Sequence, residues 1–296
     1  MRARAPLASG EREFLRGLNR KSRQESFDAA ADIDWSARMS DAEYLALYQA
    51  WSLLAGTGRD AALAERARID FARYQQINLM LFTELLERHG LRVLRRLCTE
   101  EDDPDLLEAL EHFAAEEKRH QLMFARAIGK LEAEMPGAPP LPRRHVDASL
   151  RAIFALLDAL PSRPSRVAAG FLLLEFAEQI SIIAHTISSR AIARRESFVP
   201  RVWALHALDE ARHLRFDAFI RARYRLSRLA ALAVNSAAIS LAVFSSFLLN
   251  ANDVWAARRV GARVSLWHLP GLVRKTQAPF KRSVFAMLKK MFARPG

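Results

Sequence analysis

The sequence contains 296 residues, of which 51% are hydrophobic and only 11 are glycine, and no Pro/Gly/Ser-rich linker divides it. Long stretches of Ala, Leu, Arg and Glu, without runs of alternating β-branched residues, indicate a single all-α domain. The lone cysteine, Cys98, excludes an internal disulfide, and the basic N-terminus lacks an apolar signal-like segment. These features favour a reducing, cytoplasmic location.

The formal net charge of +12 is distributed unevenly along the chain. Residues 254–296 hold ten Lys or Arg residues and no acid, which leaves a net charge of only +2 for the rest. We therefore assign the basicity to a C-terminal tail, 254–296, that packs on its own domain, and we expect no nucleic-acid binding. Contact of this basic amphipathic tail with a membrane surface is the lesser alternative.

The first part of the chain is expected to lead into a helical domain. Residues 1–39 are polar and Arg-rich, and we interpret them as a lead-in to a helical domain over 40–253. Ser40 is the predicted N-cap of a first helix over 42–55, because a serine oxygen can accept a bond from a free backbone N–H there.

Two long helices are predicted next. The first extends from about 61 to 88, with Gly90 as its C-terminal breaker. The second begins at Asp103, as the cap, and Pro104, as the first helical residue, and extends to about 134. Further helices are predicted over 147–160, 164–195, 200–225 and 229–249.

The 229–249 run is uncharged and long enough to span a bilayer. It contains Asn235 and four serines, and much of it is alanine. A helix buried within a large all-α domain has the same composition. We therefore predict a buried helix rather than a membrane span.

Two Glu-x-x-His pairs stand out in the predicted helices. Glu117 and His120 form the first, and Glu210 and His213 form the second. On a helix, residues three apart share a face. Glu84 precedes the first pair by 33 residues and Glu178 precedes the second by 32, each in a strongly apolar stretch. The two halves of the chain therefore repeat one plan, a helix with a Glu followed by a helix with Glu-x-x-His.

This plan is how carboxylate-bridged di-iron or di-manganese sites are built in four-helix bundles. Carboxylates can bridge two ions, and neutral imidazole suits iron. Four glutamates also balance the charge of two ferrous ions, which makes the burial of the carboxylates tolerable. The sequence therefore predicts two bound iron ions, with manganese as the open alternative.

The upstream glutamates each have a rival three residues away. Glu84 competes with Glu87, and Glu178 competes with Glu175. We favour Glu84 because its helical neighbours are apolar, whereas Glu87 lies next to a basic residue near the predicted helix end. We favour Glu178 because its spacing matches that of the first half. The rival acids would then lie outside the metal-ligand set.

Three further polar residues flank the pairs. His206 lies one helical turn before Glu210, and we interpret it as a seventh metal ligand rather than an ordinary core histidine. Glu116 and Asp209 each precede a ligand Glu directly. We expect them to hold the ligating histidines through the second ring nitrogen.

With these residues the sequence resembles the AurF-type p-aminobenzoate N-oxygenases, a family of ferritin-like di-iron carboxylate proteins. The resemblance rests on the two pairs, on His206, on DEARH at 209–213 and on FDAAADIDW near the N-terminus, and covers roughly residues 27–250. It implies a ferritin-like four-helix bundle with additional flanking helices. Carried over residue by residue, the implied ligands are Glu84, Glu117, His120, Glu178, His206, Glu210 and His213, of which Glu178 has a spacing close to, but not identical with, that of the family.

The resemblance also implies the chemistry. Members use two iron ions and O2 to oxidise arylamines at nitrogen, so a small-molecule amine substrate is expected. No Gly-rich dinucleotide motif is visible, so electrons are expected from an external reductant or reductase. A di-iron hydroxylase or desaturase acting on carbon, and a non-catalytic iron-binding protein, are the alternatives. A radical-generating reductase subunit would be expected to place Tyr where Phe124 stands. A homodimer is left open.

Overall fold

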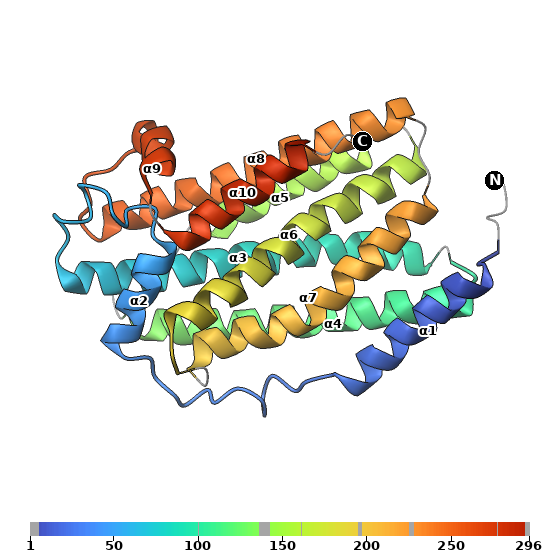
Figure 1. Cartoon of the computed structure of the whole chain (residues 1–296), viewed down its shortest axis with the longest axis horizontal. Helices are drawn as coiled ribbons and strands as arrows, with labels where there is room; N and C mark the ends of the chain where they lie inside the picture. Colours follow the sequence, from blue (N-terminus) through green and yellow to red (C-terminus); the bar gives the residue numbers. More distant parts are fainter. Residues whose placement is uncertain are drawn as a thin grey trace.

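Four long helices form the centre of the molecule (Figure 1). The computed structural model describes residues 6–99, 101–135, 143–160, 162–194, 197–224, 228–276 and 278–293, and within these residues every regular element is helical. The four central helices are α3 (Glu65–Cys98), α4 (Pro104–Ala133), α6 (Arg163–Ala191) and α7 (Phe198–Arg223). α3 pairs with α4 and α6 pairs with α7, each through a short connection. The predicted all-α four-helix bundle is therefore confirmed.

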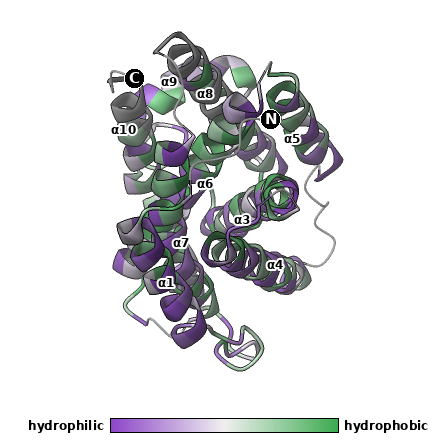
Figure 2. Cartoon of the chain, turned by 90° about the vertical axis from the view of Figure 1, so that its right-hand side faces the viewer, coloured by the Kyte–Doolittle hydropathy of each residue, from purple (hydrophilic) through white to green (hydrophobic). Residues whose placement is uncertain are grey.

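The other helices flank this bundle. They are α1 (Ser9–Gln24), α2 (Asp41–Trp51), α5 (Arg143–Asp158), α8 (Arg228–Arg259), η1 (Leu266–His268), α9 (Leu269–Lys275) and α10 (Pro279–Ala293). Viewed along the bundle, the helices turn hydrophobic faces toward one another and hydrophilic faces outward (Figure 2). Burial of these apolar faces is what drives the helices together.

The predicted helix starts at Ser40 and Asp103 are confirmed. The Ser40 hydroxyl accepts from the backbone N–H of Glu43, and the Glu43 carboxylate accepts from the backbone N–H of Ser40 at 2.7 Å. The Asp103 carboxylate accepts from the backbone N–H groups of Asp105 and Leu106, and Pro104 follows as the first helical residue. Both caps satisfy N–H groups that have no partner within the helix.

The prediction that α3 ends at Gly90 is wrong, because the helix continues for two more turns to Cys98. Gly90 keeps a helical backbone; the glycines with positive φ lie elsewhere. Close packing at this position requires the absence of a side chain, because a Cβ on Gly90 would lie 2.4 Å from Leu174 Cδ2 of α6. Gly90 is therefore a point of close helix packing and not a stop signal.

The lead-in, 1–39, contains a helix of its own. α1 lies along α4, where Arg16 Nε donates to Asp105 Oδ1 at 3.0 Å and Asn19 donates to the Asp105 carbonyl oxygen at 3.1 Å. Leu15 and Leu18 of α1 are buried. This polar segment therefore covers one side of the bundle beside α4 and α7.

The uncharged 229–249 run is helical as predicted, within α8, but it is not enclosed on all sides. Val243, Phe244 and Phe247 are 40%, 45% and 47% exposed. The reason is the place of α8, which packs on α6 and α3 from outside the bundle and leaves an outer face uncovered. In the described part of the chain, α6 is long and apolar enough to cross a membrane, and 72% of its most apolar window is buried inside the protein.

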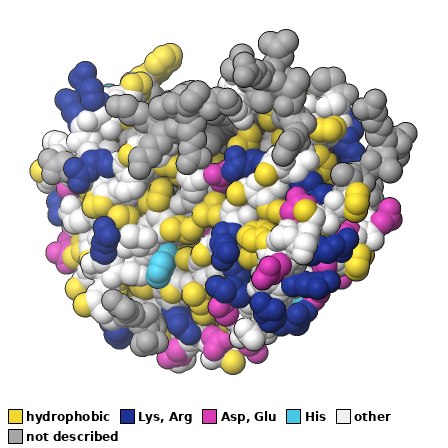
Figure 3. Space-filling view, turned by 45° about the vertical axis from the view of Figure 1, so that its right-hand side comes forward, with side chains coloured by type: hydrophobic (Ala, Val, Ile, Leu, Met, Phe, Trp, Pro, Cys, Tyr) yellow, Lys and Arg dark blue, Asp and Glu magenta, His cyan; other side chains and the backbone are white. Residues whose placement is uncertain are grey.

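The basic segment after residue 253 is anchored at two points in the described part of α10. Phe280 stacks on Trp51 of α2 with 4.2 Å between ring centroids. The Lys281 ammonium lies 2.6 Å from the carboxylate of Asp253 at the end of α8, and both side chains are buried. Over the face in Figure 3, basic side chains are interspersed with acidic and hydrophobic ones.

Two glycine variants test the packing role of Gly90. Gly90→Ala places a methyl group against Leu174, whereas Gly129→Ala on α4 meets nothing within 4 Å. Alanine favours a helix over glycine by about 1 kcal/mol, so Gly129→Ala should stabilise the protein. Gly90→Ala should lower the free energy of unfolding relative to Gly129→Ala by about 1–3 kcal/mol. Urea unfolding of the two variants measures this difference; equal stabilisation would contradict the packing role.

Candidate metal centre

The two Glu-x-x-His pairs converge between α4 and α7. Glu117, His120, Glu210 and His213 are all buried. His120 Nδ1 lies 3.4 Å from Glu210 Oε1, and His213 Nδ1 lies 3.2 Å from Glu117 Oε1. The shared helical faces inferred from the sequence therefore meet across the bundle.

His206 joins the same group. Its Nε2 atom lies 2.8 Å from Glu210 Oε1, one turn along α7, and 2.7 Å from Glu87 Oε1 of α3. The ring is fully buried, and Phe124 of α4 packs edge-on against it with 4.7 Å between centroids. A third imidazole thus connects α7 to α3 inside the bundle.

The structure brings Glu87 into this group, where the sequence analysis favoured Glu84. Glu84 pairs instead with Arg88, and its carboxyl group also interacts electrostatically with Arg143 and Asp147 of α5. The preference for Glu84 assumed that α3 ends just after Glu87, but α3 continues to Cys98, so Glu87 lies within a buried part of the helix. Glu84 and Glu87 are separated by about 60° around α3 and about 4.5 Å along it, and with this separation Glu84 faces Arg88 and α5 whereas Glu87 faces His206.

Glu178 of α6 is fully buried beside the second pair. Burial chiefly, and then the charge of Asp217, raise its pKa, and Glu210 adds to the effect. Its rival Glu175 pairs with Arg221, whose Nη2 lies 2.7 Å from the Glu175 carboxylate. Glu178, and not Glu175, therefore interacts electrostatically with Glu210, but its carboxylate is not among the groups of potential ligand atoms that lie within 4.8 Å of one another.

The side-chain atoms define two adjacent positions for a metal ion. Potential ligand atoms of Glu87, His120, His206 and Glu210 all lie within 4.8 Å of one another, and so do those of Glu117, Glu210 and His213. Glu210 belongs to both sets, as a bridging carboxylate would.

Several buried oxygen and nitrogen atoms of this group have no hydrogen-bond partner, as expected of side chains that bind a pair of cations. Both carboxylate oxygens of Glu178 and Glu210 are buried without hydrogen bonds, and so are Glu117 Oε2 and the Nδ1 atoms of His120 and His213. Buried polar atoms are seldom left in this state. Oxygen and imidazole donors gathered in this way suit iron or manganese.

A second set of charged residues holds the histidines from behind. Asp209 Oδ2 lies 2.9 Å from His120 Nε2, and Glu116 Oε2 lies 2.9 Å from His213 Nε2. The predicted contacts of Glu116 and Asp209 with the two histidines are therefore confirmed, with each acid holding the histidine of the opposite helix. Arg212 donates to both carboxylates. Each histidine is thus oriented with Nδ1 toward the other ligands.

These contacts shift the pKa values of the buried histidines and acids in opposite directions. Burial opposes a charge on His206, but Glu210 and Glu87 outweigh it and raise its pKa to about 10. Burial lowers the pKa of His120, and the neighbouring His206 lowers it further. Burial alone would raise the pKa of Asp209, but its bond to His120 and the nearby cations keep it low.

Apolar side chains surround the group. The Phe113 ring contacts His213, and Trp203 and Phe124 lie against His206. A cavity of about 20 Å³, bounded by α1, α4 and α7, reaches Glu116 and His213. This volume is about that of one water molecule. The site is therefore largely shielded from bulk water.

Comparison with known proteins supports this view of the site. A family model described as "P-aminobenzoate N-oxygenase AurF" matches residues 8–268. The chain belongs to this family. No curated protein matches the sequence significantly. Two variants of an R2-like ligand-binding oxidase with an aerobically reconstituted Mn/Fe cofactor share the fold, each at 15% identity over 94% of this chain. They match over 93% and 92% of their own length, with TM-scores of 0.53 and 0.54.

As a member of the AurF family, the chain is an oxygen-dependent di-metal oxidoreductase with a ferritin-like bundle. Sequence reasoning missed two residues of its site, Asp217 and Arg212. Asp217 follows His213 by four residues and so lies on the same helical stripe, which was a readable signal. Arg212 follows Asp209 by three residues on the same helix, which was also a readable signal, but its contact with Glu116 of α4 was not readable from spacing.

The pH dependence of stability should differ between metal-free and iron-loaded protein. In the metal-free protein, burial and neighbouring carboxylates raise the pKa of Glu87, Glu178 and Asp217, and acids raise that of His206 despite burial. The native state therefore binds more protons than the unfolded chain, and stability falls as pH rises. His120, with its lowered pKa, opposes this trend alone among the histidines of the group.

We expect the unfolding temperature of the metal-free protein to increase as the pH falls from about 7 to about 5.5. The iron-loaded protein should lose stability over the same range, because protons compete with the metal for its ligands. Calorimetry of both forms measures the two slopes. Parallel slopes would contradict the link between these buried acids and the metal.

Proposed function

We propose that this protein is a di-iron N-oxygenase that uses O2 to oxidise an arylamine at nitrogen. Membership in the AurF family supports this activity. The observation that carries the proposal is His206, a third imidazole within 2.8 Å of Glu210 and 2.7 Å of Glu87 in the buried group. His206 would supply the additional nitrogen ligand that the resemblance to N-oxygenases led us to expect.

We further propose seven ligands for the two metal ions. They are Glu87, Glu117, His120, Glu178, His206, Glu210 and His213, with Glu87 in place of Glu84. The four glutamates would balance the charge of two ferrous ions, so that the buried centre is neutral overall. The unsatisfied carboxylate oxygens of Glu178 and Glu210 support this assignment.

The chain's own residues prepare this centre in three ways. Asp209 and Glu116 accept from the Nε2–H groups of His120 and His213, which leaves each Nδ1 lone pair for a metal ion. Phe113 and Phe124 limit the access of water to the rings. When bound, the metal ions would provide the position at which dioxygen binds and is reduced. The electrons would come from an external reductant or reductase.

Iron in both positions is the proposed cofactor, and a mixed Mn/Fe pair is the alternative. The two similar oxidase structures carry a Mn/Fe cofactor, and the donor set of oxygen and imidazole suits either metal. Metal analysis of protein reconstituted with both metals would distinguish the two compositions.

Matched glutamine variants test the choice of ligand on α3. Glu87→Gln should reduce iron binding to about one ion per chain or weaken it by about 10–100-fold, because a charged ligand is lost. Glu84→Gln should keep about two ions per chain, since Glu84 pairs with Arg88. Iron content after reconstitution and desalting measures both. Iron loss in Glu84→Gln with retention in Glu87→Gln would restore the assignment made from the sequence.

The activity is tested by offering a panel of arylamines to the iron-loaded protein with a chemical reductant and ¹⁸O2. We expect a hydroxylamine, nitroso or nitro product that carries the label on nitrogen. The Glu84→Gln variant is the matched control and should keep the activity, whereas Glu87→Gln should reduce it at least about 100-fold.

Other outcomes would contradict the proposed reaction. Label that enters carbon of an amine or hydrocarbon would identify a hydroxylase or desaturase. Iron that is oxidised and retained with no labelled product across the panel would identify an iron-binding role without oxygenation.

A further inference from the structure

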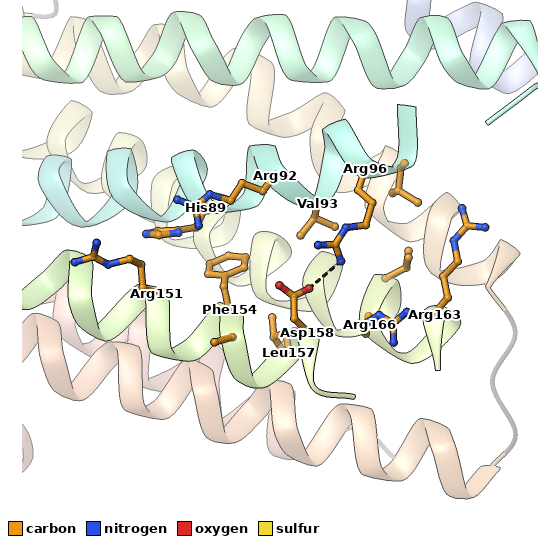
Figure 4. Close-up of a pocket in the computed structure, with 13 residues that line it drawn as sticks. His89, Arg92, Val93, Arg96, Arg151, Phe154, Leu157, Asp158, Arg163 and Arg166 are labelled. Atoms are coloured by element: carbon orange, nitrogen blue, oxygen red, sulfur yellow. Dashed lines mark hydrogen bonds and ion pairs between the residues drawn. The ribbon is translucent and has the colours of Figure 1, made fainter. Parts of the chain in front are cut away.

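A second cavity, of about 190 Å³, lies away from the metal group, where the last turns of α3 meet the end of α5 and the start of α6 (Figure 4). One part of its lining is apolar and includes Val93, Leu97, Phe154 and Val167. The other part holds five arginines, namely Arg92, Arg96, Arg151, Arg163 and Arg166.

Acidic residues compensate only part of this charge. Asp158 is the one acid among the lining residues, and its carboxylate lies 2.9 Å from Arg96 Nη1. Arg151 pairs with Asp147, which also lies 3.1 Å from His89 Nε2. Among the described residues that line the cavity, arginines therefore outnumber acids, and they stand beside an apolar wall. Gathering like charges costs free energy that an anion would recover.

The start of α6 adds to this positive potential. Arg163 and Arg166 stand in the first turns of α6, and that helix has no acidic residue in its first turn. A helix N-terminus carries a partial positive charge, so it favours acids and disfavours arginines. Arg166 Nη1 donates to the Leu160 carbonyl oxygen at 2.9 Å, which holds its guanidinium beside the cavity. An anion in the cavity would lie between Arg166 of this helix end and Arg92 of α3, both of which line it.

The dimensions limit the ligand. A dry cavity of about 150 Å³ accommodates benzene, so about 190 Å³ accommodates one ring or a short chain together with a small polar group. The guanidinium groups offer paired N–H donors that match carboxylate and phosphate oxygens.

We propose that this cavity binds a small organic anion, a carboxylate or phosphate monoester whose apolar body packs on Phe154 and Val93 while its anionic group pairs with the arginines. This site is separate from the metal centre and independent of the reaction proposed above. None of the residues lining it belongs to the metal group. Glu87 and His89 lie two residues apart on α3 and so point about 200° apart, into the bundle and toward α5.

The test uses the full-length, iron-loaded protein and isothermal titration with four probes. Benzoate and phenyl phosphate combine a ring with an anion, benzyl alcohol has the ring alone, and inorganic phosphate has the charge alone. We expect one equivalent of benzoate or phenyl phosphate to bind at least about tenfold more tightly than either single-feature probe. The tighter of the two identifies the anionic group. The affinity for the anionic ring probes should also fall as the salt concentration rises.

Variants on one helix separate the cavity from general surface charge. Arg92 and Arg96 line the cavity, whereas Arg95, which is also exposed on α3, does not. The double variant Arg92→Gln/Arg96→Gln should weaken binding by at least about tenfold, and Arg95→Gln by less than about twofold. Ala155→Trp, which places a large ring in the cavity from α5, should abolish binding and leave the iron content unchanged.

A carboxylate probe could also bind metal, so the titration is repeated with metal-free protein. Equal affinity in the two forms is expected for this cavity. Binding that disappears with the iron would overturn the proposal, as would the absence of saturable binding of both anionic ring probes up to about 10 mM. Equal losses in Arg95→Gln and the double variant would do so as well. None of these results depends on whether an amine is oxidised.

Discussion

The structure depends on the exchange of charged contacts between α4 and α7. Asp209 of α7 holds His120 of α4, and Glu116 of α4 holds His213 of α7, so each helix orients the histidine ring of the other within the candidate metal site. A small rotation of either helix would break both bonds at once and leave buried acids without partners, which is costly. Arg212 donates to both acids and fixes their separation. The relative rotation and height of the two helices are therefore set by the contacts that prepare the ligands.

α3 is the helix that connects the two sites of the molecule. Near its middle, Glu87 reaches His206, and in its last turns it lines the arginine-rich cavity with Arg92 and Arg96. α3 reaches both places because it continues through Gly90 as an unbroken helix. The absence of a side chain at Gly90 also lets Leu174 of α6 approach α3 closely. The two helices thus pack closely at Gly90, and the last turns of α3 reach the start of α6.

The part of the site that could be predicted is the part set by helical periodicity. Glu117 with His120, and His206 with Glu210 and His213, are related within one helix, so spacing alone places each set on one face. The choice between Glu84 and Glu87 depends on the rotation of α3 against α7 and on where α3 ends, and both are decided by contacts with other helices. Gly90 was a misleading signal, because glycine serves close packing as well as helix ends. The exposed face of α8 could likewise not be predicted, because the 229–249 run has no charged residues that would mark an outer face.

Glu178 and Asp217 show how the bundle tolerates its acids before and after a metal binds. Both carboxyl groups are fully buried and without hydrogen-bond donors, and burial together with neighbouring carboxylates raises both pKa values. A proton shared by this pair removes one negative charge from an apolar environment where two would be prohibitive. If a cation takes up the charge of Glu178, as proposed, the same burial would keep the proton on Asp217. The proposed centre would then combine an acid of α6 that binds a cation when it is ionised with an acid of α7, one turn beyond His213, that burial keeps protonated.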